Sequence, residues 1–323
     1  MRVRAPATSA NLGPGFDALG LALTLYDDVE AWITESGLDI EISGEGAHLA
    51  EAGEDHLVVR AMRAAFAITG GQPSGLGLRC VNSIPHGRGL GSSAAAIVTG
   101  ILAARALAGA RGTAPLPDEA VFELATDLEG HPDNVAACLV GGLTIAWMVE
   151  GHPRATRLEP LASITPVVCI APGPVRTDVA RGVLPDRVPH RDAAANAGRS
   201  ALLIAALTGQ SRPALTGAGH ADGVGVLIDA TRDRLHQDYR AVAMPHTHVL
   251  VERLRAAGIP AVVSGAGPSV LALLGADGGS ENRHHLDSLG SIVRETGNAW
   301  HVSSLDVERQ GARVLRLKPP SGR

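Results

Sequence analysis

Three glycines at alternate positions mark the segment of this chain that is best suited to chemistry. It reads Pro85-His86-Gly87-Arg88-Gly89-Leu90-Gly91-Ser92-Ser93-Ala94-Ala95, and an alanine-rich helical run follows it. A glycine-rich turn at the start of a helix exposes backbone N–H groups, and the helix dipole favours negative charge there. A serine hydroxyl at the helix start can bind a phosphate oxygen or Mg²⁺. The segment therefore predicts a binding site for a nucleoside triphosphate.

Two other phosphate-binding motifs do not fit this segment. A Walker A loop requires Gly-Lys-Ser/Thr, whereas the only lysine of the chain is Lys318, near the C-terminus. The motif Gly-x-Gly-x-x-Gly does not fit either, because Gly87, Gly89 and Gly91 are each two residues apart. A glycine-rich turn that binds nothing is the alternative at this point, since such turns are common.

The composition is that of an ordinary globular protein. The chain has 323 residues, of which 45% are hydrophobic and 19% charged, so its length allows two domains or one large one. Aromatic residues make up only 2%, so the core must be built from Ala, Val, Leu and Ile. The net charge of −5, with no basic face and few aromatics for base stacking, argues against nucleic acid as a partner.

The cysteines and the N-terminal residues bear on the compartment. Cys80, Cys138 and Cys169 are far apart, odd in number and without metal-ligand spacing, which indicates a reducing environment. The first six residues contain no apolar signal segment, and the apolar runs are too short for a membrane span. We therefore expect a cytoplasmic protein with no membrane partner.

Strand-like and helix-like patterns interleave along the chain without strict alternation. This arrangement predicts the α+β class rather than a doubly wound parallel sheet. The polar segment at residues 150–160 contains two prolines and one glycine, and it is the best candidate for a domain boundary. We therefore expect one domain over residues 1–155 and a second over residues 156–323.

Two further segments also combine glycines with serine and proline. They are Pro6-Ala7-Thr8-Ser9-Ala10-Asn11-Leu12-Gly13-Pro14-Gly15-Phe16-Asp17 and Ser264-Gly265-Ala266-Gly267-Pro268-Ser269. Together the three resemble the signature motifs of the GHMP kinases, in the same order along the chain, and the first resembles the homoserine kinase branch. The resemblance implies a two-domain fold with an N-terminal ribosomal-protein-S5-like domain and a C-terminal ferredoxin-like α/β sandwich.

The resemblance also implies ATP and Mg²⁺ as cofactors. In the family, a glutamate ten residues before an aspartate binds Mg²⁺ together with the second serine of the phosphate loop. Counted back from Asp133, this rule selects Glu123 and Ser93, and it leaves Asp127 and Glu129 to solvent. A carboxylate, a hydroxyl and phosphate oxygens are the hard ligands that Mg²⁺ prefers. Asp133 matches the catalytic aspartate of mevalonate kinases and acts here either as a base or by orienting its neighbour.

A substrate such as homoserine, which carries a carboxylate, an ammonium group and a hydroxyl, needs a polar partner for each. Arginine binds carboxylates in a two-pronged geometry, and the resemblance assigns the carboxylate to Arg181 and Arg240. It assigns the amino group and hydroxyl to Asn11 and Asp17. The substrate-binding residues implied in this way are Asn11, Asp17, Asn134, Thr177, Arg181, Arg240 and Gly265.

The activity that the resemblance implies is phosphorylation of the hydroxyl of L-homoserine in threonine biosynthesis. One alternative is another kinase of small alcohols in the same family, of the shikimate or mevalonate-pathway type. Another is a sensor that binds metabolite and nucleotide without turnover, which would be expected to have lost the Mg²⁺ glutamate or the loop serines. A homodimer is a family-level expectation.

Overall fold

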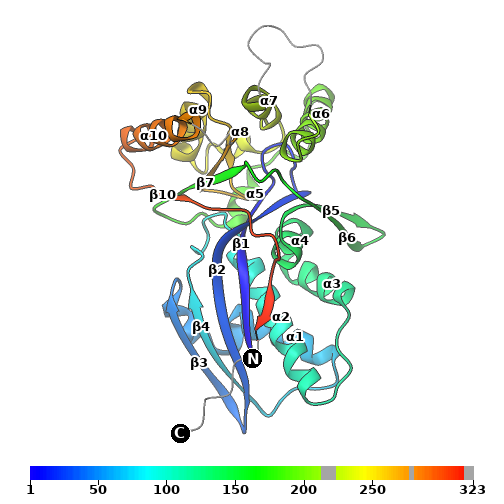
Figure 1. Cartoon of the computed structure of the whole chain (residues 1–323). Helices are drawn as coiled ribbons and strands as arrows, with labels where there is room; N and C mark the ends of the chain where they lie inside the picture. Colours follow the sequence, from blue (N-terminus) through cyan, green and yellow to red (C-terminus); the bar gives the residue numbers. More distant parts are fainter. Residues whose placement is uncertain (212–222, 276–279, 316–323) are drawn as a thin grey trace.

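The computed structural model describes residues 1–211, 223–275 and 280–315, and these form two sheets with helices packed on them (Figure 1). The larger sheet has the strand order β11-β1-β2-β4-β3, with β5 paired to both β2 and β6. Only β3 and β4 pair in parallel among these strands. The bounds are β1 (Arg2–Ala10), β2 (Leu19–Thr34), β3 (Gly37–Gly44), β4 (Gly75–Asn82), β5 (Leu143–Val149), β6 (His152–Leu158) and β11 (Arg313–Leu315).

Helices of the first half of the chain lie together on one side of this sheet (Figure 1). They are α1 (Leu57–Ile68), α2 (Ser92–Ala110), α3 (Asp118–Glu129) and α4 (Pro132–Val140), and a 3₁₀ segment, η1 (Ala47–Asp55), precedes α1. The small residues of α2 allow close packing, since a Cβ on Gly100 would lie 2.5 Å from the Val58 carbonyl oxygen of α1. In the described part of the chain, α2 is the one helix long and apolar enough to span a membrane, and 67% of it is buried in the protein.

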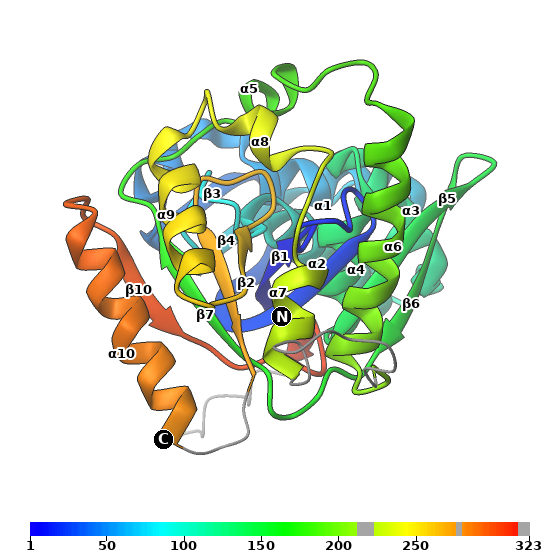
Figure 2. The same ribbon diagram turned by 90° about the horizontal axis from the view of Figure 1, so that it is seen from above.

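The smaller sheet is antiparallel, with the order β10-β7-β9-β8. One face packs against α9 and α10 through Val167, Leu250 and Leu289, and the other face joins the main core through Val168 and Leu271. Viewed from above, α9 and α10 lie on one side of this half and α6 and α7 on the other (Figure 2). The bounds are β7 (Thr165–Ile170), α5 (Thr177–Gly182), α6 (His190–Leu207), α7 (Gly223–Ala230), α8 (Gln237–Arg240), α9 (Pro245–Ala256), β8 (Ala261–Val263), β9 (Val270–Leu274), α10 (Ser280–Glu295) and β10 (His301–Ser304).

The α+β class expected from the sequence is confirmed by this arrangement. The boundary expected after residue 155 falls inside β6, which stays paired with β5 as far as Leu158. The chain also returns to the larger sheet at β11, which pairs with β1. The two sheets therefore do not divide the chain at a single point. Lys318 lies outside the described residues.

The glycine-rich loop between β4 and α2 runs between the two halves of the molecule. Gly87, Gly89 and Gly91 have φ angles of 65°, 73° and 68°, in the left-handed region that glycine adopts most readily. A Cβ on Gly89 would lie 2.1 Å from the Ser264 carbonyl oxygen, so no side chain fits there. The alternate spacing of the glycines thus reflects both backbone conformation and close contact with the other half of the chain.

We expect Gly89→Ala to lower thermal stability and ATP affinity much more than Gly112→Ala. Gly112 also has a positive φ, 84°, but no atom lies within 4 Å of its Cβ position. Gly112→Ala should therefore cost only the free energy of placing alanine in the left-handed conformation, about 1 kcal/mol. In Gly89→Ala the new Cβ must also displace backbone atoms near Ser264. Thermal unfolding and ATP titration calorimetry on both variants make the comparison. Equal losses would show that the contact with Ser264 is unimportant.

Candidate active site

The three glycine-containing segments meet around a cavity of about 180 Å³ between the two halves of the molecule. Its wall is formed by β1, the glycine-rich segment at residues 85–95 (the phosphate loop), α3, α4, α5, α8 and the β8–β9 turn. Charged and polar side chains dominate this wall, as a site for phosphates and a polar substrate requires. The lining residues are Ala10, Asn11, Gly87, Gly89, Gly91, Ser92, Ser93, Glu129, His131, Asp133, Asn134, Thr177, Arg181, Arg240, Gly265, Ala266 and Gly267.

The phosphate loop is held by its carbonyl groups. The oxygens of Gly87, Gly89 and Leu90 accept hydrogen bonds from Val175 N (2.9 Å), Ser264 Oγ (2.6 Å) and Thr8 N (3.0 Å), respectively. By contrast, the N–H groups of residues 87–93 donate no hydrogen bond within the described ranges. These donors, together with the N-terminus of α2, are therefore available to an anion.

A second cavity, of about 290 Å³, shares Ser92 and Ser93 with the first. Its wall is more apolar and includes Val29, Leu49 and Val58. Such a chamber next to a phosphate loop suits the nucleoside part of a nucleotide. His56 lines it and is 7% exposed, burial lowers its pKa, and its Nδ1 has no hydrogen-bond partner among the described residues.

The carboxylate beside Ser93 is Glu129 rather than the expected Glu123. Ser93 Oγ donates a hydrogen bond of 2.7 Å to Glu129 Oε1, and both residues line the first cavity. Burial raises the pKa of Glu129. Glu123 instead lies against His152 of β6, with Oε1 at 2.9 Å from Nδ1, and lines neither cavity. The expected pairing of Glu123 with Ser93 is therefore wrong.

Glu123 does not reach Ser93 because it points in a different direction from α3 than Glu129 does. Both glutamates belong to this helix, and they are six residues apart, which corresponds to about 600° of rotation and about 9 Å along the axis. They therefore face different directions, and only Glu129, the last residue of α3, reaches the cavity. Within the described ranges no group of three or more His, Cys, Asp or Glu could hold a metal ion. A cation here would need ligand phosphates in addition to Ser93 and Glu129.

Asp133 organises the part of the wall that α4 contributes. It is 1% exposed, and its Oδ1 accepts the Asn134 N–H (2.7 Å) and contacts His131 Nδ1 (2.8 Å). Burial alone would lower the pKa of His131, but the hydrogen bond and charge of Asp133 outweigh it and raise that pKa. Thr8 Oγ1 donates to Asn134 Oδ1 (2.7 Å), which fixes the Asn134 amide. Asp133 and Thr8 thus orient the two side chains beside them.

Asp17 and Arg181 form an ion pair at the edge of the cavity. The Arg181 guanidinium donates to both carboxylate oxygens of Asp17, at 2.6 and 3.1 Å. The Asp17 N–H in turn donates to Asn11 Oδ1 (2.9 Å), and Asn11 Nδ2 donates to the Gly265 carbonyl (2.7 Å). Asn11 and Asp17 have positive φ angles of 67° and 53°, a conformation that Asn and Asp tolerate better than most residues. Arg181 thus already has a carboxylate partner.

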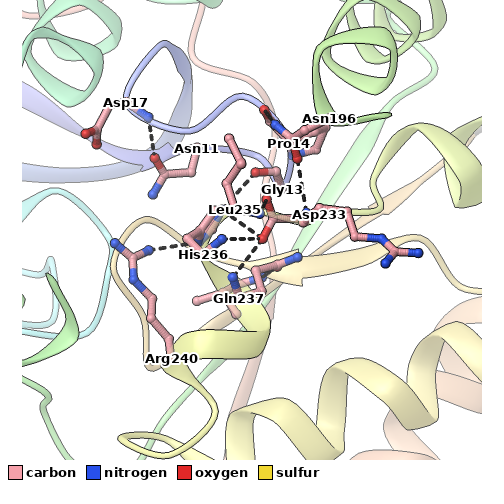
Figure 3. Close-up of polar contacts among 12 residues, drawn as sticks. Asn11, Gly13, Pro14, Asp17, Asn196, Asp233, Leu235, His236, Gln237 and Arg240 are labelled. Atoms are coloured by element: carbon pink, nitrogen blue, oxygen red, sulfur yellow. Dashed lines mark hydrogen bonds and ion pairs between the residues drawn. The ribbon is translucent and has the colours of Figure 1, made fainter. Parts of the chain in front are cut away.

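Arg240 is in the opposite situation, because it is 1% exposed and has no carboxylate within ion-pair distance among the described residues. Its Nη1 lies 2.9 Å from His236 Nδ1 (Figure 3). Its Nε donates to the Ala180 carbonyl (3.1 Å) and its Nη1 to the Gly265 carbonyl (3.3 Å). Burial, together with the charge of Arg181, lowers the pKa of Arg240 to about 10. A buried cation with no carboxylate in direct contact favours binding of an anionic ligand.

The structure brings together most of the residues selected from the sequence. Asn11, Asn134, Thr177, Arg181, Arg240, Gly265, Asp133 and Ser93 line the first cavity with the loop glycines. Asp17 lies beside them through Arg181, and His86 lines the second cavity. Sequence reasoning missed Glu129 and His131. The two residues flank Gly130, where α3 ends and α4 begins, just before Asp133. This position is the signal that could have identified them.

Comparisons with known proteins agree with this geometry. Residues 56–142 match the model of the GHMP kinases N terminal domain, and residues 213–299 that of the GHMP kinases C terminal domain. The chain is 56% identical to a homoserine kinase of Streptomyces coelicolor over 321 residues, which cover 99% of this chain and 96% of the relative. A homoserine kinase of Streptomyces avermitilis is also 56% identical, over 98% of this chain and 96% of the relative.

A solved structure of a homoserine kinase has the same fold. The crystal structure of homoserine kinase from Cytophaga hutchinsonii superposes with a TM-score of 0.81 at 25% identity, covering 98% of this chain and 97% of that one. The chain therefore belongs to the GHMP kinase family.

We expect Glu129→Gln to reduce phosphoryl transfer by about 100-fold, or about 2.7 kcal/mol in the barrier, and to raise the Mg²⁺ concentration needed for activity. The substitution keeps the shape of the side chain and removes its charge. Glu123→Gln, on the same helix, is the matched control and should behave like the wild type. Initial rates over a Mg²⁺ series measure both. A larger defect in the Glu123 variant would reverse the assignment.

Proposed function

We propose that this chain transfers the γ-phosphoryl group of ATP to the side-chain hydroxyl of L-homoserine, giving O-phospho-L-homoserine for threonine biosynthesis. Full-length relatives named homoserine kinase at 56% identity support the proposal. The observation that carries it is Arg240, a buried cation without a carboxylate partner in the described chain, in the same cavity as the phosphate loop. A phosphate donor and an anionic small molecule can thus be bound side by side.

Substrate binding is assigned by charge. Arg240 receives the substrate carboxylate, because a buried charge is costly unless it is paired. Asp17 and Asn11 are proposed to bind the ammonium group, since Asn11 lines the cavity with Arg240 and the Asp17 carboxylate lies at its edge on Arg181. Arg181 is already paired with Asp17; it orients the Asp17 carboxylate and adds positive charge next to the substrate. Thr177 and the Gly265 backbone complete the wall.

Catalysis is proposed to rest on positioning and on neutralisation of charge. The phosphate-loop N–H groups and the α2 dipole stabilise the phosphates. Ser93 and Glu129 are hard oxygen donors in hydrogen-bond contact, and they fit Mg²⁺, which neutralises phosphate charge when bound. Asp133 is proposed to hold Asn134 and His131 in the orientation that places the substrate hydroxyl.

The rival functions differ from this one in ligand chemistry. Shikimate and mevalonate carry a carboxylate but no amino group, so neither would use the Asp17–Asn11 pair as an ammonium site. A sensor without turnover is disfavoured because Ser92, Ser93 and Glu129 all line the cavity. An ADP-release assay with homoserine, shikimate, mevalonate and galactose distinguishes these functions. Release with homoserine alone supports the proposal, and release with another substrate, or none, contradicts it.

We expect Arg240→Gln to abolish the preference for homoserine over homoserine amide, which lacks the carboxylate charge. The ratio of kcat/KM values for the two compounds should fall by at least about 10-fold, the loss expected for a charged hydrogen bond, while the KM for ATP changes little. Because both compounds are tested on the same variant, general destabilisation cancels in the ratio.

Arg176→Gln is the matched control, since Arg176 is 81% exposed and pairs with Asp178 on the surface. Its ratio should match that of the wild type. An Arg240 variant that still discriminated as strongly as the wild type would place the carboxylate site elsewhere.

A further inference from the structure

His236 is a fully buried histidine that contacts Arg240 but does not itself line the cavity. It immediately precedes α8, and Arg240 follows it by four residues, so both side chains lie on the same face of that helical turn. Figure 3 shows the imidazole between the Arg240 guanidinium and the loop that carries Gly13. Its Nε2 lies 2.8 Å from the Gly13 carbonyl oxygen, and its Nδ1 lies 2.9 Å from Arg240 Nη1.

These two contacts determine the proton position on the ring. A carbonyl oxygen only accepts hydrogen bonds, so Nε2 must carry a hydrogen to bond Gly13. A guanidinium only donates, so Nδ1 must be unprotonated to accept from Arg240. The neutral Nε2–H tautomer alone satisfies both partners. Burial lowers the pKa of His236, which agrees with a neutral ring.

The backbone and ring of His236 are held as firmly as its nitrogens. Asp233 accepts hydrogen bonds from three consecutive N–H groups, those of Leu235 (2.9 Å), His236 (2.9 Å) and Gln237 (2.7 Å). The imidazole stacks on Phe16, with 5.1 Å between ring centroids. The Phe16 ring also contacts Arg240, whose guanidinium carbon lies 5.5 Å from the ring centroid. The position of His236 is thus fixed before any ligand binds.

The partners of His236 belong to two different substrate-binding segments. Gly13 lies between Asn11 and Asp17, in the loop after β1, and its neighbour Pro14 is held by Asn196 Nδ2 (2.6 Å) from α6. Arg240 belongs to α8 in the other half of the chain. His236 therefore connects the loop that would bind the ammonium group to the arginine that would bind the carboxylate.

We propose that His236 is a positioning residue for substrate binding, which orients the Arg240 guanidinium toward the substrate carboxylate through Nδ1 and is itself anchored to the loop of Asn11 and Asp17 through Nε2. By accepting from Nη1, the imidazole occupies one edge of the guanidinium and leaves another for the ligand. This role rests on the proposed function, because it requires that Arg240 bind the carboxylate. It also assigns the two ring nitrogens different tasks, which can be separated.

Two amide substitutions separate these tasks. The Oδ1 of Asn can occupy the place of Nδ1, so His236→Asn retains an acceptor for Arg240 and loses the donor to Gly13. The Nε2 of Gln can occupy the place of the ring Nε2, so His236→Gln retains the donor to Gly13 and loses the acceptor. Each variant removes one hydrogen bond of a buried residue, and each is the other's control for stability.

The readout is the ratio of kcat/KM for homoserine to that for homoserine amide. His236→Gln should lower this ratio by about 10-fold, the effect of one hydrogen bond to a charged group. The loss should be in the KM for homoserine, with kcat at saturation and the KM for ATP nearly unchanged. His236→Asn should keep the wild-type ratio. Equal ratios in the two variants would overturn the positioning role and leave His236 as a core residue.

The wild type and Arg240→Gln separate this proposal from the proposed function. If the wild type itself fails to prefer homoserine over its amide, the proposed function fails, whatever His236 does. If those two proteins behave as expected and the His236 variants do not differ, only the positioning role fails.

A measurement on the wild type tests the tautomer directly. ¹⁵N NMR of histidine-labelled protein at neutral pH should show a protonated Nε2 and an unprotonated Nδ1 for the ring whose signals disappear in His236→Gln. The reverse tautomer, or a charged ring, at His236 would overturn the proposal.

Discussion

The arrangement of this site depends on how the carbonyl groups of the phosphate loop are bound. Three oxygens of this loop accept hydrogen bonds from the segments at Thr8, Val175 and Ser264, which come from both halves of the chain. A loop fixed through its carbonyls leaves its N–H groups for phosphate. The same three contacts bring the β1 segment, α5 and the β8–β9 turn to one cavity. Phosphate binding and assembly of the substrate site therefore have a common cause.

Charge is distributed unevenly across this cavity. Glu129 and Asp133 lie on the side of α3 and α4, and each has a hydrogen-bond donor, Ser93 or His131. On α5 and α8, Arg181 is paired with Asp17, whereas Arg240 has only uncharged hydrogen-bond partners among the described residues. The remaining positive charge is buried, and burial makes its interaction with an incoming carboxylate stronger than in water. The proposed selectivity for an anionic substrate rests on this buried cation, Arg240.

The sequence alone predicted the α+β class, the phosphate loop and the joint use of three distant glycine-containing segments. The class follows from the interleaved strand and helix patterns, and the loop follows from glycines before a helix start. The joint use of the three segments was implied by the resemblance to the GHMP kinases. The prediction that Glu123 lies beside Ser93 was wrong, since counting residues to Asp133 does not determine the direction in which a helical side chain points. His236 could not be identified either, because its burial depends on Gly13, 223 residues away, and the chain has thirteen histidines.

The central claim is that the phosphoryl group is transferred to the homoserine hydroxyl, and ³¹P NMR of the reaction tests it most directly. With ATP, Mg²⁺ and L-homoserine, the account predicts a new phosphomonoester signal whose splitting shows coupling to the γ-methylene protons, formed in step with ADP. A phosphorus signal without that coupling, as expected for an acyl phosphate, would contradict it. So would inorganic phosphate as the only new species, because the protein would then hydrolyse ATP without transferring the group to the hydroxyl.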